Sequence, residues 1–169
     1  QDDPRKCTAR ALERRGHATL HYDVRQSPKR GFLLDPNSGV LLGPDDRKLI
    51  DRGAAIVALD CSWKSLGESL SEMSTNTSLI PRTLPLVLAA NPVSWGKPGR
   101  LSTAEALCVS LILSGRTEQA KSIILPFSFG EQFLNLNHEP LLAYSRAASN
   151  TELARMQWEF FDMPELTDD

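Results

Sequence analysis

The residues best suited to chemistry lie in the segment Leu84–Ala106, which reads LPLVLAANPVSWGKPGRLSTAEA. Its first part, residues 84–91, is a short apolar run bounded by turn residues, which is typical of a strand buried on both faces. Ser102 and Glu105 have the spacing of a capping box, so a helix should begin at Ser102 or Thr103. The proline- and glycine-rich loop between them could form a nucleotide-sized pocket from its backbone, because ligands of open parallel sheets bind where strands end and helices begin. An ordinary strand-loop-helix crossover has the same spacing, so the segment alone leaves both interpretations open.

The elements that must position this loop alternate between helices and strands, which favours an α/β fold. Short apolar runs predict strands at 18–24, 31–34, 54–60 and 84–91. Capping residues and amphipathic spacing predict helices at 5–15, from 45 or 46 to 53, within 64–79, from 102 or 103 to 115, at 117–127, at 131–148 and at 151–161. Asp3 and Pro4 should begin the first helix, Gly16 should end it, Pro140 should bend or break the helix 131–148, and 73–78 should be a flexible loop.

Composition limits the class of protein. The chain has 169 residues, 41% hydrophobic and 24% charged, enough for a real core in one domain or two small lobes. We expect neither a membrane span nor a secretory signal, because there is no run of 18 apolar residues and no charged segment leading into an apolar one. Its cysteines, Cys7, Cys61 and Cys108, are odd in number and widely spaced, and its three histidines are scattered. The cysteine pattern favours a reduced cytosol, and both patterns argue against a metal site.

Charge is distributed unevenly along the chain. Residues 1–30 carry eight Lys and Arg against four Asp and Glu, a net charge of +4, whereas residues 150–169 carry a net charge of −5. A basic N-terminal lobe suits a polyanion such as RNA, because neutralised phosphates supply salt-dependent affinity. A solvated helix face explains the same pattern equally well.

Four motifs occur in an order that resembles the small-subunit ribosomal RNA aminocarboxypropyltransferase family. They are DDPRKCTARAL at the start, LDCSW at 59–63, the segment Leu84–Ala106, and FSFGEQFLNLN at 127–137. The resemblance covers nearly the whole chain. It implies an N-terminal α/β lobe, residues 1–82, and a C-terminal lobe, residues 83–169, similar to the knotted SPOUT methyltransferases, with a deep trefoil knot that would be an exception among folds.

The resemblance also implies an activity. Members of the family transfer the 3-amino-3-carboxypropyl group of S-adenosylmethionine to N3 of a hypermodified uridine, usually N1-methylpseudouridine, and release methylthioadenosine. Methyl transfer would begin from the same sulfonium, so the orientation of the cofactor decides which carbon faces the nucleophile. We therefore expect a cytoplasmic, monomeric enzyme of ribosome biogenesis that acts on small-subunit rRNA or a pre-ribosomal particle, without a metal.

The matching motifs imply the roles of individual residues. The cofactor-binding residues would be Thr8, Leu34, Pro36, Leu59, Ser62, Trp63, Leu84, Gly99, Leu101, Thr103 and Ala106. Trp63 would place its ring beside the sulfonium, where it can attract the cation and hold the methyl group. Asp60 would either orient the amino group of the cofactor or accept the N3 proton. The basic residues placed to contact RNA phosphates are Arg5, Lys6, Arg10, Lys29, Arg30, Lys97 and Arg100.

The chain departs from the family pattern at three points. Gly99 stands where an aromatic residue is expected, Trp95 replaces the tyrosine of the NPxxYG pattern, and the family pattern has a further strand before DDPRKC, a motif that starts here right after Gln1. A backbone contact survives the change at Gly99, whereas a stacking role would not. Two other functions stay open: SPOUT-type methyl transfer to RNA, and a ribosome-assembly factor that binds RNA through its basic lobe without catalysis.

Overall fold

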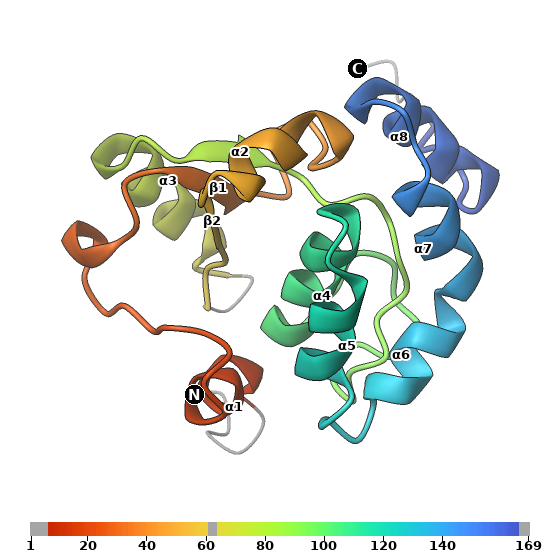
Figure 1. Cartoon of the computed structure of the whole chain (residues 1–169), viewed down its shortest axis with the longest axis horizontal. Coiled ribbons are helices and arrows are strands. Elements are labelled where there is room, and N and C mark those ends of the chain that lie inside the picture. Colours follow the sequence, from red (N-terminus) through yellow and green to blue (C-terminus); the bar gives the residue numbers. More distant parts are fainter. Residues whose placement is uncertain (1–6, 61–63, 166–169) are drawn as a thin grey trace.

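The computed structural model describes residues 7–60 and 64–165, and this part of the chain has the α/β class expected from the sequence (Figure 1). Its strands are β1 (Gly31–Leu34), β2 (Ala55–Val57) and β3 (Ile80–Arg82). Its α-helices are α1 (Thr8–Arg14), α2 (Arg47–Asp51), α3 (Leu66–Asn76), α4 (Thr103–Leu113), α5 (Thr117–Ile124), α6 (Gly130–Leu136), α7 (His138–Ser145) and α8 (Asn150–Met156). Three 3₁₀ turns, η1 (Val24–Gln26), η2 (Pro44–Asp46) and η3 (Gln157–Glu159), complete the described elements.

The strands form one parallel sheet in the order β2-β1-β3. Successive side chains of the central strand β1 point to opposite faces, as the strand geometry requires. Phe32 is fully buried against Ile50 of α2, whereas Leu33 packs with Leu70 and Met73 of α3. The two helices therefore cover opposite faces of the sheet, and both faces of β1 are closed to water.

The remaining helices build a second and larger core. It gathers apolar residues of α4 to α8, and Leu12 brings α1 into the same cluster. In Figure 1, α6, α7 and α8 follow one another along one side of the molecule, and α4 and α5 lie between them and the sheet. Leu84 packs against both this cluster and the Phe32 cluster, so the chain passes from sheet to helices through a continuous apolar contact.

Two of the four predicted strands are present and two are not. The strand 31–34 is confirmed, and the strand 54–60 is confirmed over the shorter span Ala55–Val57. The prediction for 18–24 is wrong, because the carboxylate of Asp23 accepts a hydrogen bond from the backbone N–H of Arg25 and closes the turn η1 instead. Residues 84–91 are extended but belong to no strand. The strand β3, which was not predicted, lies just before them and is an outer strand of the sheet.

Helix boundaries follow capping chemistry more closely than composition. Ser102 and Glu105 form the expected capping box, and α4 begins at Thr103. In the described part of the chain the first helix begins at Thr8, after Cys7 as its extended N-cap, and the predicted cap at Asp3 and Pro4 lies outside the described residues. The predicted loop 73–78 is mostly helical, since α3 continues to Asn76.

The break in the predicted helix 131–148 falls at Asn137 rather than at Pro140. Pro140 lies in the first turn of α7, where the missing N–H of proline costs no helical hydrogen bond. Within the described ranges, no helix is both long and apolar enough to cross a membrane.

Candidate functional site

The carboxyl ends of the three strands meet at one edge of the sheet. Because all three strands are parallel, Leu34 at the end of β1, Leu59 just after β2 and Leu84 just after β3 lie at the same edge. This is the edge where ligands of parallel α/β sheets bind. Leu34 and Leu84 are half-buried with the Phe32 cluster, and Leu59 is half-buried with the α3 cluster, while Pro36 is exposed just beyond β1.

Asp60 connects this edge to the starts of two helices. The hydroxyl of Thr103, the first residue of α4, lies 3.4 Å from Asp60 Oδ1 and donates to it. The thiol of Cys7, at the start of α1, donates to Asp60 Oδ2 over 3.2 Å. Asp60 is itself exposed, so its carboxylate is held by protein on one side and open to solvent on the other.

Thr8 binds the start of α4 as well. Its hydroxyl oxygen accepts a hydrogen bond of 3.1 Å from the backbone N–H of Ala104, 96 residues along the chain. The next N–H, that of Glu105, donates to the Ser102 hydroxyl. These two donors of the first turn are therefore satisfied within the protein, and a ligand at this helix end would meet mainly the side chains of Thr8, Thr103 and Asp60.

The extended segment 84–91 replaces strand pairing with hydrogen bonds to helical side chains. The N–H and C=O of Leu88 bond to the Asn137 side chain at 2.7 and 2.8 Å, which reproduces the two bonds of a ladder pair. The C=O of Leu86 accepts from the Tyr144 hydroxyl at 2.8 Å, and its N–H donates to Gln157 at 3.2 Å. Side chains of the helical shell thus hold this segment where a neighbouring strand would be expected.

The other edge of the segment pairs with the loop that follows it. The N–H of Ala89 donates to the C=O of Lys97 at 3.1 Å, and the N–H of Gly99 donates to the C=O of Val87 at 3.0 Å. Gly99 has a φ of 72°, a conformation that favours glycine over the aromatic residue expected from the family pattern. The loop expected from the sequence is therefore present, and its backbone hydrogen-bonds to the segment before it.

Glu105 connects the end of the segment 84–91 to α4 by hydrogen bonds. Its fully buried carboxylate accepts hydrogen bonds from the N–H of Ala90 at 3.3 Å, the N–H of Ser102 at 3.3 Å and the Asn91 amide at 3.2 Å. Burial raises the pKa of Glu105 above its usual value, although these hydrogen bonds oppose the shift. Glu105 therefore joins the loop to the helix that carries Thr103.

The remaining predicted cofactor residues line the same region with half-buried apolar surface. Leu84, Leu101 and Ala106 are each partly exposed, and Leu84 and Leu101 pack against the helical core. With the carboxylate of Asp60 and the hydroxyls of Thr8 and Thr103, the predicted set combines apolar and polar side chains.

Four predicted site residues cannot be compared with the structure. Ser62 and Trp63 of the cofactor set, and Arg5 and Lys6 of the RNA set, lie outside the described residues. The other five basic residues of the RNA set are all exposed: Arg10, Lys29, Arg30, Lys97 and Arg100. The guanidinium of Arg30 donates to the C=O of Arg52, which fixes that side chain against α2.

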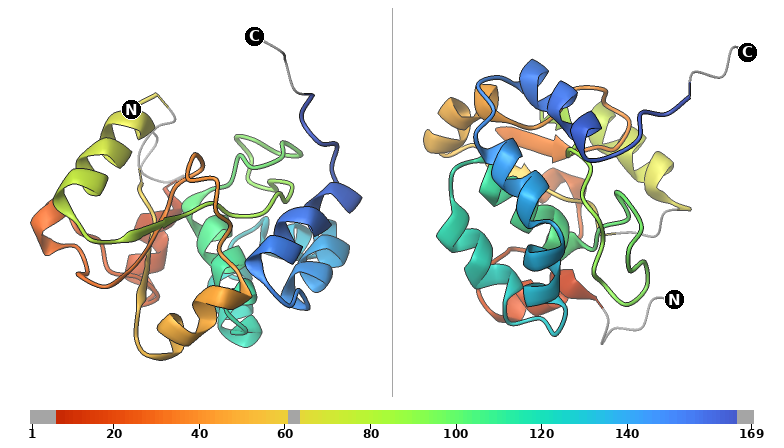
Figure 2. Two further views of the ribbon diagram at one scale, coloured as in Figure 1. Left: turned by 90° about the horizontal axis from the view of Figure 1, so that it is seen from above. Right: turned by 90° about the vertical axis from the view of Figure 1, so that its right-hand side faces the viewer.

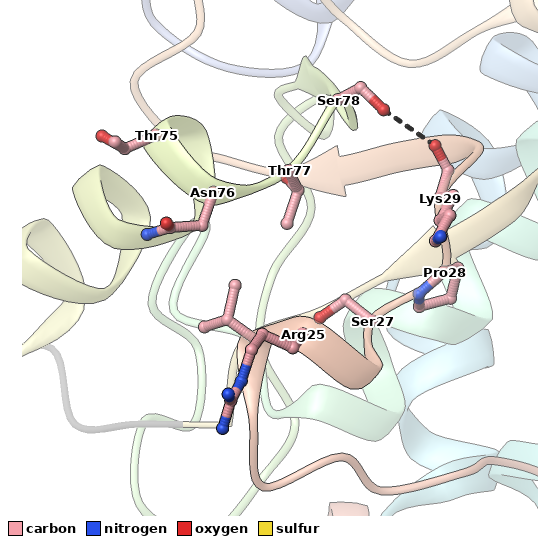
Figure 3. Close-up of a pocket in the computed structure, with 9 residues that line it drawn as sticks. Arg25, Ser27, Pro28, Lys29, Thr75, Asn76, Thr77 and Ser78 are labelled. Carbon is pink, nitrogen blue, oxygen red and sulfur yellow. Dashed lines mark hydrogen bonds between the residues drawn. The ribbon is translucent and has the colours of Figure 1, made fainter.

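A polar cavity of about 350 Å³ lies away from these cofactor residues, between η1 and the end of α3 (Figure 3). It contains Lys29 of the predicted RNA set and Arg25, which was not predicted. Hydroxyl and amide side chains form most of the rest of its lining: Ser27, Thr75, Asn76, Thr77 and Ser78. None of the predicted cofactor residues lines it.

Sequence reasoning missed the buried side chains that hydrogen-bond to the segment 84–91. Asn137 stands in the last of the four motifs, but no role was assigned to it. Its signal was its place four residues after Phe133 and four before Leu141, on the apolar side of the helical pattern, where burial of a polar side chain requires a hydrogen-bond partner. Tyr144 carried no such signal; burial raises the pKa of its phenol, which keeps the hydroxyl protonated as a donor to Leu86.

Neither of the described thiols, Cys7 and Cys108, is activated as a nucleophile. Burial raises the pKa of Cys108 to about 12, and burial together with Asp60 raises that of Cys7. Among residues 7–60 and 64–165, no group of His, Cys, Asp or Glu is arranged to hold a metal ion.

Comparison with known proteins adds an independent observation. Residues 32–161 match a family model described as "Ribosome biogenesis protein, C-terminal". The chain is 39% identical to a 16S rRNA aminocarboxypropyltransferase of Methanosarcina mazei, over 93% of this chain and 88% of the relative, and 39% identical to one of Halobacterium salinarum, over 97% and 93%. Its structure is similar to that of the SAM-dependent rRNA:acp-transferase Tsr3 from Vulcanisaeta distributa, with a TM-score of 0.81, 31% identity, and coverage of 95% of this chain and 90% of the other.

Proposed function

The chain belongs to the family of 16S rRNA aminocarboxypropyltransferases, and from this premise we propose how its residues serve that activity. The enzyme transfers the 3-amino-3-carboxypropyl group of S-adenosylmethionine to small-subunit ribosomal RNA. The observation that carries the assignment of the site is the meeting of Thr8, Asp60 and Thr103. These residues are far apart in sequence and lie at the carboxyl edge of a parallel sheet.

We assign the amino-acid end of the cofactor to these polar residues. Asp60 is exposed and carries negative charge, so it suits the ammonium group of S-adenosylmethionine. A carboxylate has about four lone-pair sites, and the bonds from Cys7 and Thr103 leave others for a further donor. Orientation of the amino group is therefore the role we favour for Asp60, and acceptance of the N3 proton is the alternative.

The adenosine end belongs, in this proposal, to the apolar wall and the hydrogen-bonded loop. Leu34, Leu59, Leu84, Leu101 and Ala106 supply the wall, with Pro36 at its rim. Gly99 leaves the backbone of the loop accessible because it carries no side chain. When bound, S-adenosylmethionine supplies the sulfonium whose adjacent propyl carbon is the transferred one.

Orientation of the cofactor then selects the reaction. Residues at both ends of the site hold the propyl chain toward RNA and the methyl group toward protein, so that only the propyl carbon lies in line with the attacking N3. Ser62 and Trp63, which follow Asp60 and Cys61 in the chain, complete this assignment on the basis of the family motif LDCSW.

The RNA substrate is proposed to lie along the exposed basic residues. Arg10, Lys29, Arg30, Lys97 and Arg100 are the described members, and Arg5 and Lys6 extend the set. The cavity of Figure 3 suits a stretch of RNA backbone, because Lys29 and several hydroxyls can bind phosphate and ribose, while Arg25 is paired with Asp23. The target is N3 of an N1-methylpseudouridine in a hairpin loop, since an unpaired nucleotide is the one that can reach a protein site.

The finer architecture is also part of the proposal. We divide the chain at residues 1–82 and 83–169 and assign a SPOUT-like, knotted arrangement to the C-terminal lobe. The support for this is the course of residues 84–91, which run between α4 and the helices α6 to α8 and bond to side chains from several of them (Figure 1). We further propose a monomer that acts in the cytoplasm; Cys7 and Cys108, the described cysteines, are both free thiols.

Two labelled forms of S-adenosylmethionine test the reaction directly. With label in the carboxyl carbon, the proposed activity transfers label to a small-subunit rRNA hairpin. With label in the methyl group, the label remains in methylthioadenosine and none enters RNA. Methyl label alone in RNA would establish SPOUT-type methyl transfer, and transfer of neither label would leave the assembly-factor function.

Two variants make the experiment specific to the site. Asp60→Asn should lose most of the transfer of carboxyl label. Asp51→Asn, a matched change of an exposed aspartate on α2, should transfer label like the parent protein. Equal transfer by both variants would contradict the placement of the site at Asp60.

A further inference from the structure

The loop after residue 91 is a closed and hydrogen-bonded turn rather than a mobile segment. The N–H of Gly96 donates to the C=O of Ala89 at 2.7 Å, and the N–H of Lys97 donates to the C=O of Ser94 at 3.0 Å. The N–H of Ser94 also donates to the side chain of Asn91 at 3.0 Å. The backbone on both sides of Trp95 is therefore held in one conformation before any ligand arrives.

This rigid turn presents apolar side chains to solvent. Trp95 is 56% exposed and Val93 is 75% exposed, and neither belongs to an apolar cluster of the described residues. Tryptophan is usually buried to a high degree, so an exposed one on a fixed turn calls for an explanation. Figure 2 shows the turn, in light green, standing clear of the neighbouring helices.

The charge around Trp95 identifies the kind of partner. Residues 92–101 contain the cations Lys97 and Arg100 and no carboxylate, and both cations are exposed. An aromatic face beside cations matches unpaired nucleic acid, in which bases stack on aromatic rings while the backbone contacts Lys and Arg. A double helix would not present a free base face.

The position of the turn connects it to the proposed site. Gly99 bonds to the extended segment at Val87, and the chain then enters α4 at Thr103, which bonds to Asp60. A base placed on Trp95 would therefore lie on the same loop that ends at the candidate cofactor residues. The turn is preformed, so less conformational entropy is lost when it orders an RNA strand.

We propose that Trp95 is a stacking platform for an unpaired base that flanks the modified nucleotide, with Lys97 and Arg100 on the adjacent phosphates. This inference rests on the proposed function, because it takes the RNA substrate as the ligand. It adds a binding subsite that positions the RNA and does not take part in the transfer itself.

The test measures binding of a synthetic small-subunit rRNA hairpin to the full chain. Trp95→Ala should weaken binding at least about fivefold, and Trp95→Phe should restore most of it, because base-aromatic stacking contributes about 1–3 kcal/mol. Leu142→Ala, which trims another exposed apolar side chain on α7, is the matched control and should bind like the parent. A fully paired duplex of the same stem should not distinguish Trp95→Ala from the parent.

Salt dependence and fluorescence separate stacking from charge. Trp95→Ala should leave the slope of log K against log salt unchanged, whereas Lys97→Ala should reduce it by about one unit. Addition of the hairpin should quench tryptophan emission less in Trp95→Phe than in the parent.

Two results would overturn the inference: hairpin affinity equal in Trp95→Ala and parent, or an equal loss with Leu142→Ala. Failure of the proposed function would look different, since the parent protein would then transfer no carboxyl label to RNA. Affinity for S-adenosylmethionine, measured by calorimetry, should be the same in Trp95→Ala and the parent, which keeps the RNA subsite distinct from the cofactor site.

Discussion

The hydroxyl of Thr103 donates a hydrogen bond to Asp60 across 43 residues of sequence, and that contact joins the segment just after β2 to the start of α4. It places a carboxylate and a hydroxyl side by side at the carboxyl edge of the sheet. The same carboxylate accepts from Cys7, so three elements converge on Asp60.

Asp60→Asn keeps the shape of the side chain and removes its charge. Since a hydrogen bond to a charged group contributes about 1.5–3 kcal/mol, we expect the dissociation constant for S-adenosylmethionine to rise roughly tenfold or more. Calorimetry measures this directly. Unchanged cofactor affinity with a slow transfer rate would instead favour the role of Asp60 as proton acceptor.

Asn137→Ala should destabilise the protein by about 2–4 kcal/mol, because it empties a fully buried position and leaves the N–H and C=O of half-buried Leu88 without partners. Asn137→Asp should also be destabilising, since it keeps the acceptor for the Leu88 N–H but loses the donor to the Leu88 C=O. Urea unfolding measures both variants. Asn135→Ala, on an exposed position of α6, is the matched control and should be near neutral; an equal loss there would contradict a specific role for Asn137.

Glu105 should make stability depend on pH. Burial raises its pKa above the usual 4.5, so the folded protein holds this proton to a higher pH than the unfolded chain. The resulting stabilisation is complete below the unfolded pKa and is lost as the pH rises through the folded pKa. Compared with Glu105→Gln, the parent should therefore lose free energy of unfolding as the pH is raised from about 4 toward neutrality.

Urea unfolding at a series of pH values tests this prediction. Glu118→Gln, which removes an exposed carboxylate on α5, should follow the pH dependence of the parent. A stability difference between the parent and Glu105→Gln that rises with pH would contradict the raised pKa.

The ion pair between Asp46 and Arg82 should matter more than the exposed ones. Asp46 is 4% exposed and Arg82 20% exposed, and Asp46 also accepts from the side chain of Asn150. Asp46→Ala leaves a largely buried guanidinium without its partner, so we expect a loss of about 3 kcal/mol in the free energy of unfolding. Glu118→Gln, which breaks the exposed pair with Lys121, should cost less than about 0.5 kcal/mol.

Local features of the chain were predicted well where the interaction itself is local. The capping box of Ser102 and Glu105 and the strand Gly31–Leu34 could be predicted from spacing over a few residues. The strand at 18–24 could not, because its apolar pattern carries no information on whether a neighbouring strand is present. Asp23 offered the backbone a closer partner, and a turn formed.

The extended segment 84–91 shows the same limit of prediction from local sequence. Its apolar run and its place before the loop were evident, and its burial was expected. Whether its N–H and C=O groups would bond to a strand or to side chains depended on Asn137, Tyr144 and Gln157, which lie 49 to 71 residues away.

The family, the loop and the helix start that border the proposed cofactor site could be predicted from the sequence, because motif order and helix capping depend on neighbouring residues. Three contacts could be found only in the folded structure: Thr8 with Ala104, Thr103 with Asp60, and the helical side chains with the segment before the loop. The physical reason is that each of these hydrogen bonds joins residues far apart in the chain. Such a bond forms only when the packing of whole elements has already brought its donor and acceptor within reach.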